Sequence, residues 1–232
     1  MQINQNVTPL ELDQYSAATR TNKVLRNTYL LTALALVPMA IGAVVGANMS
    51  FAFIAGSPVM AFFGFMLVTY GLMFGIQANR NSGVGIALML VFTGVLGIMM
   101  GPLLQQVLRF SNGGMLVAFA ALGTAGVFGG MAAVGTAIKR PLQGLGKFLT
   151  VGAIVLLIAM VANVFLQIPA FALMISTLFI FFSSLLILWQ LNAIVTGGED
   201  NYISATLTLV VSIYNIFVSL LQIFGVLGGS RD

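Results

Sequence analysis

Long apolar runs separated by short polar segments make up the chain from about residue 28 to its end. A helix needs roughly 20 apolar residues to cross a hydrocarbon core about 30 Å thick. The runs that reach this length without Asp, Glu, Lys or Arg are Thr28–Asn48, Ser57–Gln77, Val84–Leu104, Met115–Ala137, Phe148–Ile168, Ala170–Gln190 and Ile203–Gly228. This pattern predicts an all-α membrane protein, a bundle of seven transmembrane helices.

The junction between the fifth and sixth runs is very short, because only Gln167, Ile168 and Pro169 separate them. A tight hairpin between two spanning helices and a re-entrant segment both fit this spacing. A polar segment of about 27 residues precedes the first apolar run. The run itself is too long to be the apolar part of a cleaved signal peptide. We therefore expect an N-terminal cytoplasmic tail, residues 1–27, followed by a transmembrane domain, residues 28–232.

The positively charged residues are divided unevenly between the two ends of the predicted bundle. Lys and Arg are enriched in the cytoplasmic loops of membrane proteins. The larger set is Arg20, Lys23, Arg26, Arg80, Lys139, Arg140 and Lys147, and the smaller set is Arg109 and Arg231. The N-terminus is therefore predicted in the cytoplasm. An odd number of spans then places the C-terminus on the opposite side.

Composition narrows the chemistry that this chain can carry. Hydrophobic residues make up 59% and charged residues 6% of the 232 residues, and the mean hydropathy is +1.07. The absence of Cys and His excludes disulfides, Cys/His metal sites and Ser-His or Cys-His nucleophiles. No Asp, Glu, Lys or Arg lies inside a predicted span, so a proton relay of carboxylates or an intramembrane aspartyl protease is not expected. We expect no enzymatic activity, no catalytic residue, no metal site and no cofactor.

The net charge of +4 raises the question of an anionic partner. The basic residues flank the apolar runs, which places them at the level of the lipid headgroups. The expected partner of these charges is therefore the lipid bilayer and not a nucleic acid.

Uncharged polar residues recur at helical spacing within the last three predicted spans. Neutral polar side chains in a span either hydrogen-bond to neighbouring helices or line a hydrated cavity or small-cation path. The spacing predicts an interior polar cluster and leaves both of these roles open. The candidate residues are Asn163, Gln167, Gln190, Ser212, Asn215 and Ser219.

The N-terminal tail carries two local signals. Thr8, Pro9 and Glu11 have the spacing of a helix capping box with proline at the first helical position, which predicts a short tail helix. Arg20 and Lys23, with Arg26, follow at three-residue spacing immediately before the first span. Such a basic cluster fits an anchor on anionic lipid, and it also fits a recognition surface for a protein partner. We take the tail as the candidate partner-binding segment.

Several glycine pairs have the G-x-x-x-G spacing that lets helix backbones approach closely in lipid. This spacing favours compact packing inside the bundle, with oligomer contacts or mobile helix interfaces as alternatives. The pairs are Gly42/Gly46, Gly71/Gly75, Gly97/Gly101, Gly126/Gly130 and Gly225/Gly229.

Four segments, residues 22–29, 160–170, 197–203 and 212–221, carry a resemblance to a known family. Their order and spacing, with the seven-span layout, resemble the Bax inhibitor-1 family, and in particular its bacterial inner-membrane members that modulate the protease FtsH. The resemblance implies a protein that binds this membrane-anchored, ATP-dependent protease and restrains its attack on other membrane proteins. The tail would be engaged by the protease, and extraction of seven packed spans would be slow.

Other members of this family resemble calcium leak channels that are gated by pH through paired aspartates in the last two spans. The matching positions in this chain are Gln190 and Ser212, whose side chains do not titrate near neutral pH. The resemblance therefore leaves passive cation passage as an alternative function, without the carboxylate pair that would make it depend on pH.

Overall fold

The computed structural model describes residues 9–52 and 56–229, with side chains from Thr19 onward. All long elements within these ranges are helices, and seven spans are long and apolar enough to cross a membrane, which confirms the predicted bundle. The third span contains two helices, because the chain is interrupted at Met100 just before Pro102. The helices are α1 Pro9–Asn48, α3 Pro58–Ala78, α4 Gly83–Met99, α5 Gly101–Val107, α6 Gly113–Ala137, α7 Gln143–Leu166, α8 Pro169–Val195 and α9 Tyr202–Leu227.

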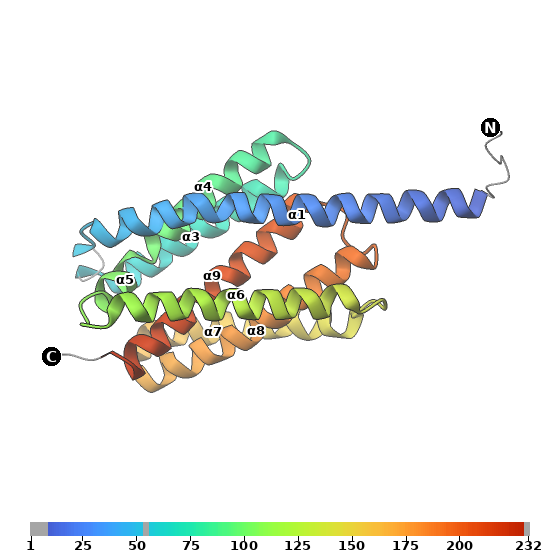
Figure 1. The fold of residues 1–232 in the computed structure, drawn as a ribbon. Coiled ribbons are helices and arrows are strands. Elements are labelled where there is room, and N and C mark those ends of the chain that lie inside the picture. Colours follow the sequence, from blue (N-terminus) through green and yellow to red (C-terminus); the bar gives the residue numbers. More distant parts are fainter. Residues whose placement is uncertain (1–8, 53–55, 230–232) are drawn as a thin grey trace.

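The central element of the bundle is α9. It contacts α1, α3, α4, α5, α6 and α8, and only α7 among the described helices does not touch it. Figure 1 shows α9 crossing obliquely between a group formed by α1, α3 and α4 and a group formed by α6, α7 and α8. Residues on nearly every side of α9 are buried, as expected of a helix surrounded by others in a bundle.

The first helix is longer than a single membrane span. It runs without interruption from Pro9 to Asn48, and its 40 residues correspond to about 60 Å at 1.5 Å per residue. Pro9 is the first described residue of this helix, because Thr8 of the predicted capping box lies outside the described residues. The backbone shows no break at residue 28, where we expected the tail to end. Pro38 lies inside the helix without ending it. The N-terminal part of α1 therefore projects beyond the bundle (Figure 1).

The junction between α7 and α8 is a tight hairpin. Gln167 adopts a left-handed conformation with φ of 50° and ψ of 38°, and its backbone N–H donates to the carbonyl oxygen of Asn163 at 2.8 Å. Ile168 is extended and Pro169 begins α8, as is usual for proline at a first helical turn. Both flanking helices are long enough to span, so the hairpin is found and the re-entrant segment is not.

Glycine lets α1 and α4 pack with their backbones in contact. A Cβ atom added to Gly42 would meet the carbonyl oxygen of Gly94, and one added to Gly97 would meet the carbonyl oxygen of Met39. Gly101 approaches the carbonyl oxygen of Gly46 in the same way. The prediction of packing inside the bundle is therefore correct for the first and third G-x-x-x-G pairs.

The pair on α6 behaves differently from the pairs on α1 and α4. A Cβ atom at Gly126 or Gly130 would have no neighbour within 4 Å, so these glycines are not used for packing among the described residues. Gly225 and Gly229 lie against the side chains of Val107 and Phe110 instead of another helix backbone. The G-x-x-x-G spacing alone therefore does not show whether a glycine pair contacts the backbone of another helix.

Two asparagine side chains join the loops at the basic end of the bundle. Asn192 is 1% exposed, and its Nδ2 donates to the carbonyl oxygens of Ile138 at 2.8 Å and Arg140 at 3.2 Å. Its Oδ1 accepts from the backbone N–H of Leu142 at 3.1 Å. The α6–α7 loop is therefore attached to α8 through one side chain.

Asn201 has a similar role between the α8–α9 loop and the α3–α4 loop. Its Oδ1 caps α9 by accepting from the backbone N–H groups of Ile203 and Ser204, both at 3.0 Å. Its Nδ2 donates to the carbonyl oxygen of Arg80 at 3.0 Å and to Oδ1 of Asn81 at 2.7 Å. Three of the loops at this end are thus held in place by two asparagines.

Candidate functional site

A cavity of about 450 Å³ lies among α3, α4, α7, α8 and α9. Three of the six predicted cluster residues line it, namely Asn163 from α7 and Asn215 and Ser219 from α9. The spacing of Asn215 and Ser219, four residues apart, places them on one face of α9. Further polar side chains reach the same cavity, and they are Thr69, Tyr70, Ser176 and Gln222.

The hydrogen bonds around this cavity satisfy only part of its polar groups. Ser176 Oγ lies 2.8 Å from Gln222 Oε1, which links α8 to α9. Asn163 Oδ1 is buried and has no hydrogen-bond partner. Asn215 and Ser219 likewise make no side-chain hydrogen bond to a described residue. A polar group without a partner is costly in the membrane interior, so the cavity is a place where water or a small polar ligand would be stabilised.

The other three predicted residues lie outside this cavity. Gln167 is exposed at the end of α7 and borders a second, more open cavity with Ser57 and Val164. Gln190 is 2% exposed, and its Nε2 has no hydrogen-bond partner. Ser212 is fully buried, and its Oγ donates to the carbonyl oxygen of Thr208 one turn earlier at 2.8 Å. No hydrogen bond joins Gln190 to Ser212 in the described part of the chain.

Among the described residues, no charged side chain lines the polar cavity. Within the described residues, Glu199 and Asp200 belong to the segment between α8 and α9, outside the spans. The cavity can therefore offer neutral carbonyl, amide and hydroxyl groups, which bind water or coordinate a cation weakly. Its described lining includes no carboxylate that could exchange a proton near neutral pH.

The predicted partner-binding tail is described only in part. Thr8 lies outside the described residues, and Pro9 and Glu11 are described as backbone of α1 without their side chains. The basic residues of the tail, Arg20 and Lys23 with Arg26, are exposed on α1. They lie where this helix leaves the apolar part of the bundle.

Comparison with known proteins agrees with this architecture. The family model described as "Inhibitor of apoptosis-promoting Bax1" matches residues 21–229. The chain is 44% identical over 212 residues to the protein named "Modulator of FtsH protease YccA" from Escherichia coli K12, covering 91% of this chain and 93% of that protein. It is also 45% identical to an uncharacterised protein of Neisseria meningitidis serogroup A, over 90% and 92% of the two chains. The chain belongs to the Bax inhibitor-1 family.

The match to the Bax inhibitor-1 family leaves out the first twenty residues. The projecting start of α1 therefore lies outside the part that the family model describes. The chain is also 36% identical over 212 residues to an uncharacterised membrane protein of Vibrio cholerae, covering 90% of this chain and 92% of that protein.

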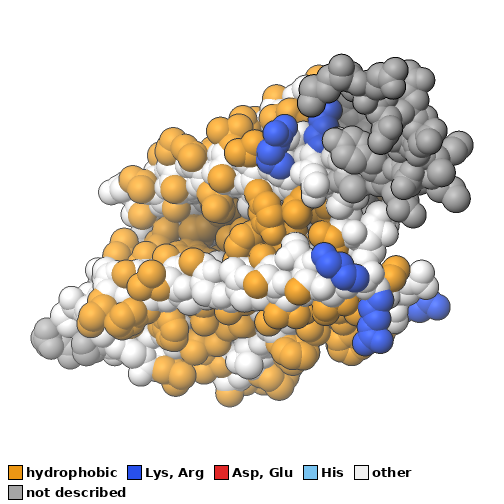
Figure 2. Space-filling view, turned by 45° about the vertical axis from the view of Figure 1, so that its right-hand side comes forward, with side chains coloured by type: hydrophobic (Ala, Val, Ile, Leu, Met, Phe, Trp, Pro, Cys, Tyr) orange, Lys and Arg blue, Asp and Glu red, His pale blue; other side chains and the backbone are white. Residues whose placement is uncertain are grey.

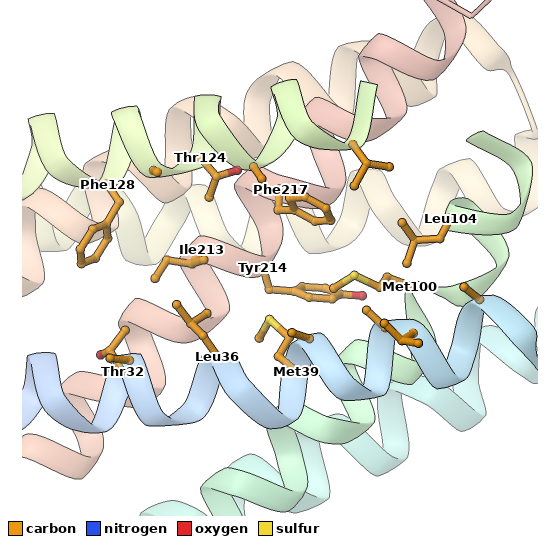
Figure 3. A pocket seen from close by; sticks show the side chains of 18 of the residues that line it. Thr32, Leu36, Met39, Met100, Leu104, Thr124, Phe128, Ile213, Tyr214 and Phe217 are labelled. Atoms are coloured by element: carbon orange, nitrogen blue, oxygen red, sulfur yellow. The ribbon is translucent and has the colours of Figure 1, made fainter. Parts of the chain in front are cut away.

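The structure of this Bax inhibitor-1 protein contains an apolar groove that sequence reasoning missed. The groove has a volume of about 670 Å³ and lies between α1 and α6, with α9 as its floor. Figure 2 shows it as a hollow with apolar rims, and Figure 3 shows Thr32, Leu36 and Met39 of α1 facing Thr124 and Phe128 of α6 across it. A signal was present, because Ala33, Ala40 and Ala47 recur every seven residues along the groove side of α1.

Tyr214 separates the two cavities. Its side chain lines the apolar groove, where it lies beside Met39 and Met100 (Figure 3), and it also lines the polar cavity. Asn215, the next residue along α9, lines the polar cavity and not the groove. One helix therefore divides an apolar compartment from a polar one within the bundle.

Proposed function

We propose that this protein binds a membrane-anchored, ATP-dependent protease of the FtsH type and restrains it by acting as a poorly extracted substrate. The observation that carries the proposal is the similarity, over nine-tenths of the chain, to a protein named as a modulator of that protease. Seven spans with short connections leave catalysis and ATP hydrolysis to the partner. The proposed location is the bacterial inner membrane, because another similar protein is named an inner membrane protein.

The shape of α1 supports a role as the engaged element. Because α1 is one continuous helix from Pro9 to Asn48, a force applied near its N-terminus acts directly on the first span. An exposed terminal segment is the usual starting point for a protease that works on unfolded chain. The proposal requires this end to lie in the cytoplasm, as the distribution of Lys and Arg indicates.

The same helix is held in the bundle by contacts at several points along its span. Its glycines bring its backbone into direct contact with the backbone of α4. At its far end, Gln105 Nε2 donates to the carbonyl oxygens of Gly46 at 3.0 Å and Met49 at 2.7 Å. Near its middle, Thr206 Oγ1 donates to the carbonyl oxygen of Thr28 at 3.3 Å. A pull on α1 therefore meets the resistance of α4, α5 and α9 together, which makes extraction slow and occupancy of the protease long.

Deletion of residues 1–22 tests this proposal. The truncated protein should keep its span structure but lose co-purification with the protease and protection of other membrane substrates. A matched control replaces the segment with a shuffled sequence of the same length and composition. If the truncated protein still co-purifies and still protects, the tail is not the engaged segment and the proposal is wrong.

Passive cation passage is a second candidate, favoured by one observation. Asn163, Asn215 and Ser219 place uncharged oxygen atoms around one cavity within the spans, with few protein partners. Calcium flux into liposomes containing the purified protein should fall when Asn163 and Asn215 are both replaced by Leu, if ions use this cavity. Absence of flux through the unmodified protein over a wide pH range removes this candidate and leaves the protease proposal untouched.

A further inference from the structure

The apolar groove between α1 and α6 exposes surface that most bundles bury. Its α1 wall runs from Tyr29 to Ala47, which is about 27 Å of helix and close to the thickness of the hydrocarbon core. Ala40 on one wall and Ala121 on the other have exposed side chains within the groove. The hollow opens sideways between spans (Figure 2), so its surroundings are the acyl chains of the bilayer.

Basic residues flank one end of this groove. Arg26 precedes Ala33 by seven residues and Ala40 by fourteen, so all three lie on the same side of α1. On the opposite wall, Lys139 follows the end of α6, and its Nζ lies 3.4 Å from the carbonyl oxygen of Thr136. Figure 2 shows Lys and Arg side chains beyond one end of the hollow on both of its walls, and no Asp or Glu side chain among the described residues of this face. A negatively charged group there would be attracted from both sides.

We propose that this groove binds one anionic phospholipid, with an acyl chain between α1 and α6 and the phosphate near Arg26 and Lys139. The lipid belongs to the leaflet at the basic end of the bundle, whichever side of the membrane that is. The apolar lining holds the chain, and the paired basic residues select the negative headgroup.

The form of the groove favours a lipid over a helix of another protein. Tyr29 of α1 and Phe128 of α6 meet edge to face, with ring centroids 6.3 Å apart, and so bridge the two walls near the basic end. A helix about 10 Å wide could not follow the groove to that end without separating these rings. A flexible acyl chain bends over them. The same argument disfavours a helix of a second copy of this chain.

Filling the groove tests the apolar half of the proposal. The protein, purified in mild detergent, is mixed with phosphatidylglycerol and observed by native mass spectrometry. Replacing both Ala40 and Ala121 by Phe should reduce the retained lipid about tenfold or more. Val37→Phe is the matched control, because Val37 is 55% exposed on α1 but does not line the groove. Equal thermal unfolding of the three proteins shows that they are folded, and unchanged lipid retention in the filled variant overturns the proposal.

Removing the basic pair tests the headgroup half of the proposal with substitutions at two exposed positions. A Lys or Arg near an anionic lipid surface changes binding by about fivefold. Arg26→Gln with Lys139→Gln should therefore lower the preference for phosphatidylglycerol over phosphatidylcholine on the order of tenfold, and Lys147→Gln, on α7, should not. Equal retention of the two lipids by the unmodified protein would show that the occupant is not an anionic phospholipid. The same conclusion would follow if a dimer or a co-purifying membrane protein occupied the groove in place of lipid.

Discussion

At the scale of single residues, some polar side chains of this bundle connect loops, and others leave polar groups unpaired beside a cavity. Asn192 and Asn201 satisfy nearly all of their hydrogen-bonding groups and hold loops together. Asn163 instead leaves a buried oxygen without a partner beside a cavity. A fully satisfied buried amide rigidifies a structure, whereas an unsatisfied one marks a place for water or ligand. The distinction separates the structural asparagines from the candidate site.

Asn192→Ala tests the structural role of the loop asparagine. The substitution removes three hydrogen bonds and leaves the carbonyl oxygens of Ile138 and Arg140 without this donor. We expect a loss of about 2–4 kcal/mol in the free energy of unfolding, from the net value of the bonds and the unsatisfied groups. Denaturant titration in detergent micelles measures it. Asn48→Ala is the control, since Asn48 is exposed and bonds only within its own helix turn; equal effects at both positions would contradict the assignment.

At the scale of helices, close backbone approach joins α1 to α4. Gly97→Ala places a Cβ atom against the carbonyl oxygen of Met39 and 2.8 Å from the backbone nitrogen of Ala43. Neither atom can move without shifting α1, so we expect a loss of about 1–3 kcal/mol in stability, as for other overpacked sites. If α1 is the engaged element, the same variant should also be degraded faster by the protease. Unfolding in detergent and turnover in membranes measure the two effects.

The matched control for this substitution lies on α6. Gly126→Ala adds a methyl group where no atom lies within 4 Å, so it should be neutral or stabilising by about 0.5–1 kcal/mol through helix propensity. A similar loss in both variants would show that glycine matters here for a reason other than the contact of α1 with α4.

The element scale also shows what the sequence could predict. Each span follows from its own run of apolar residues, so all seven were predictable, and so was the shared face of Asn215 and Ser219. Which residues of other helices join that face depends on tertiary packing, so Thr69, Tyr70 and Ser176 were not found. Gln167 was placed with Asn163 by a four-residue spacing, but α7 ends at Leu166 and Gln167 turns into the left-handed region, which carries its side chain away from the helical stripe.

At the scale of the whole molecule, the orientation of the bundle in the membrane decides which side the projecting end of α1 faces. The polar cavity and the apolar groove share Tyr214 as a wall, and both lie within the spans. The basic residues that flank the groove and the projecting end of α1 belong to the same end of the bundle. Both the lipid and the protease proposals therefore use this one end, although only the second requires it to be cytoplasmic.

The absence of cysteine from the chain makes its orientation directly measurable. Ser82→Cys lies in the α3–α4 segment at the basic end, and Ser50→Cys follows α1 at the opposite end; both positions are exposed. An excess of Lys and Arg marks the cytoplasmic side. In intact spheroplasts, a membrane-impermeant maleimide should therefore label the Ser50→Cys protein at once and the Ser82→Cys protein only after permeabilisation. The reverse pattern would place the projecting end of α1 outside the cytoplasm, where an ATP-driven protease cannot engage it, and would refute the proposed function while leaving the lipid site intact.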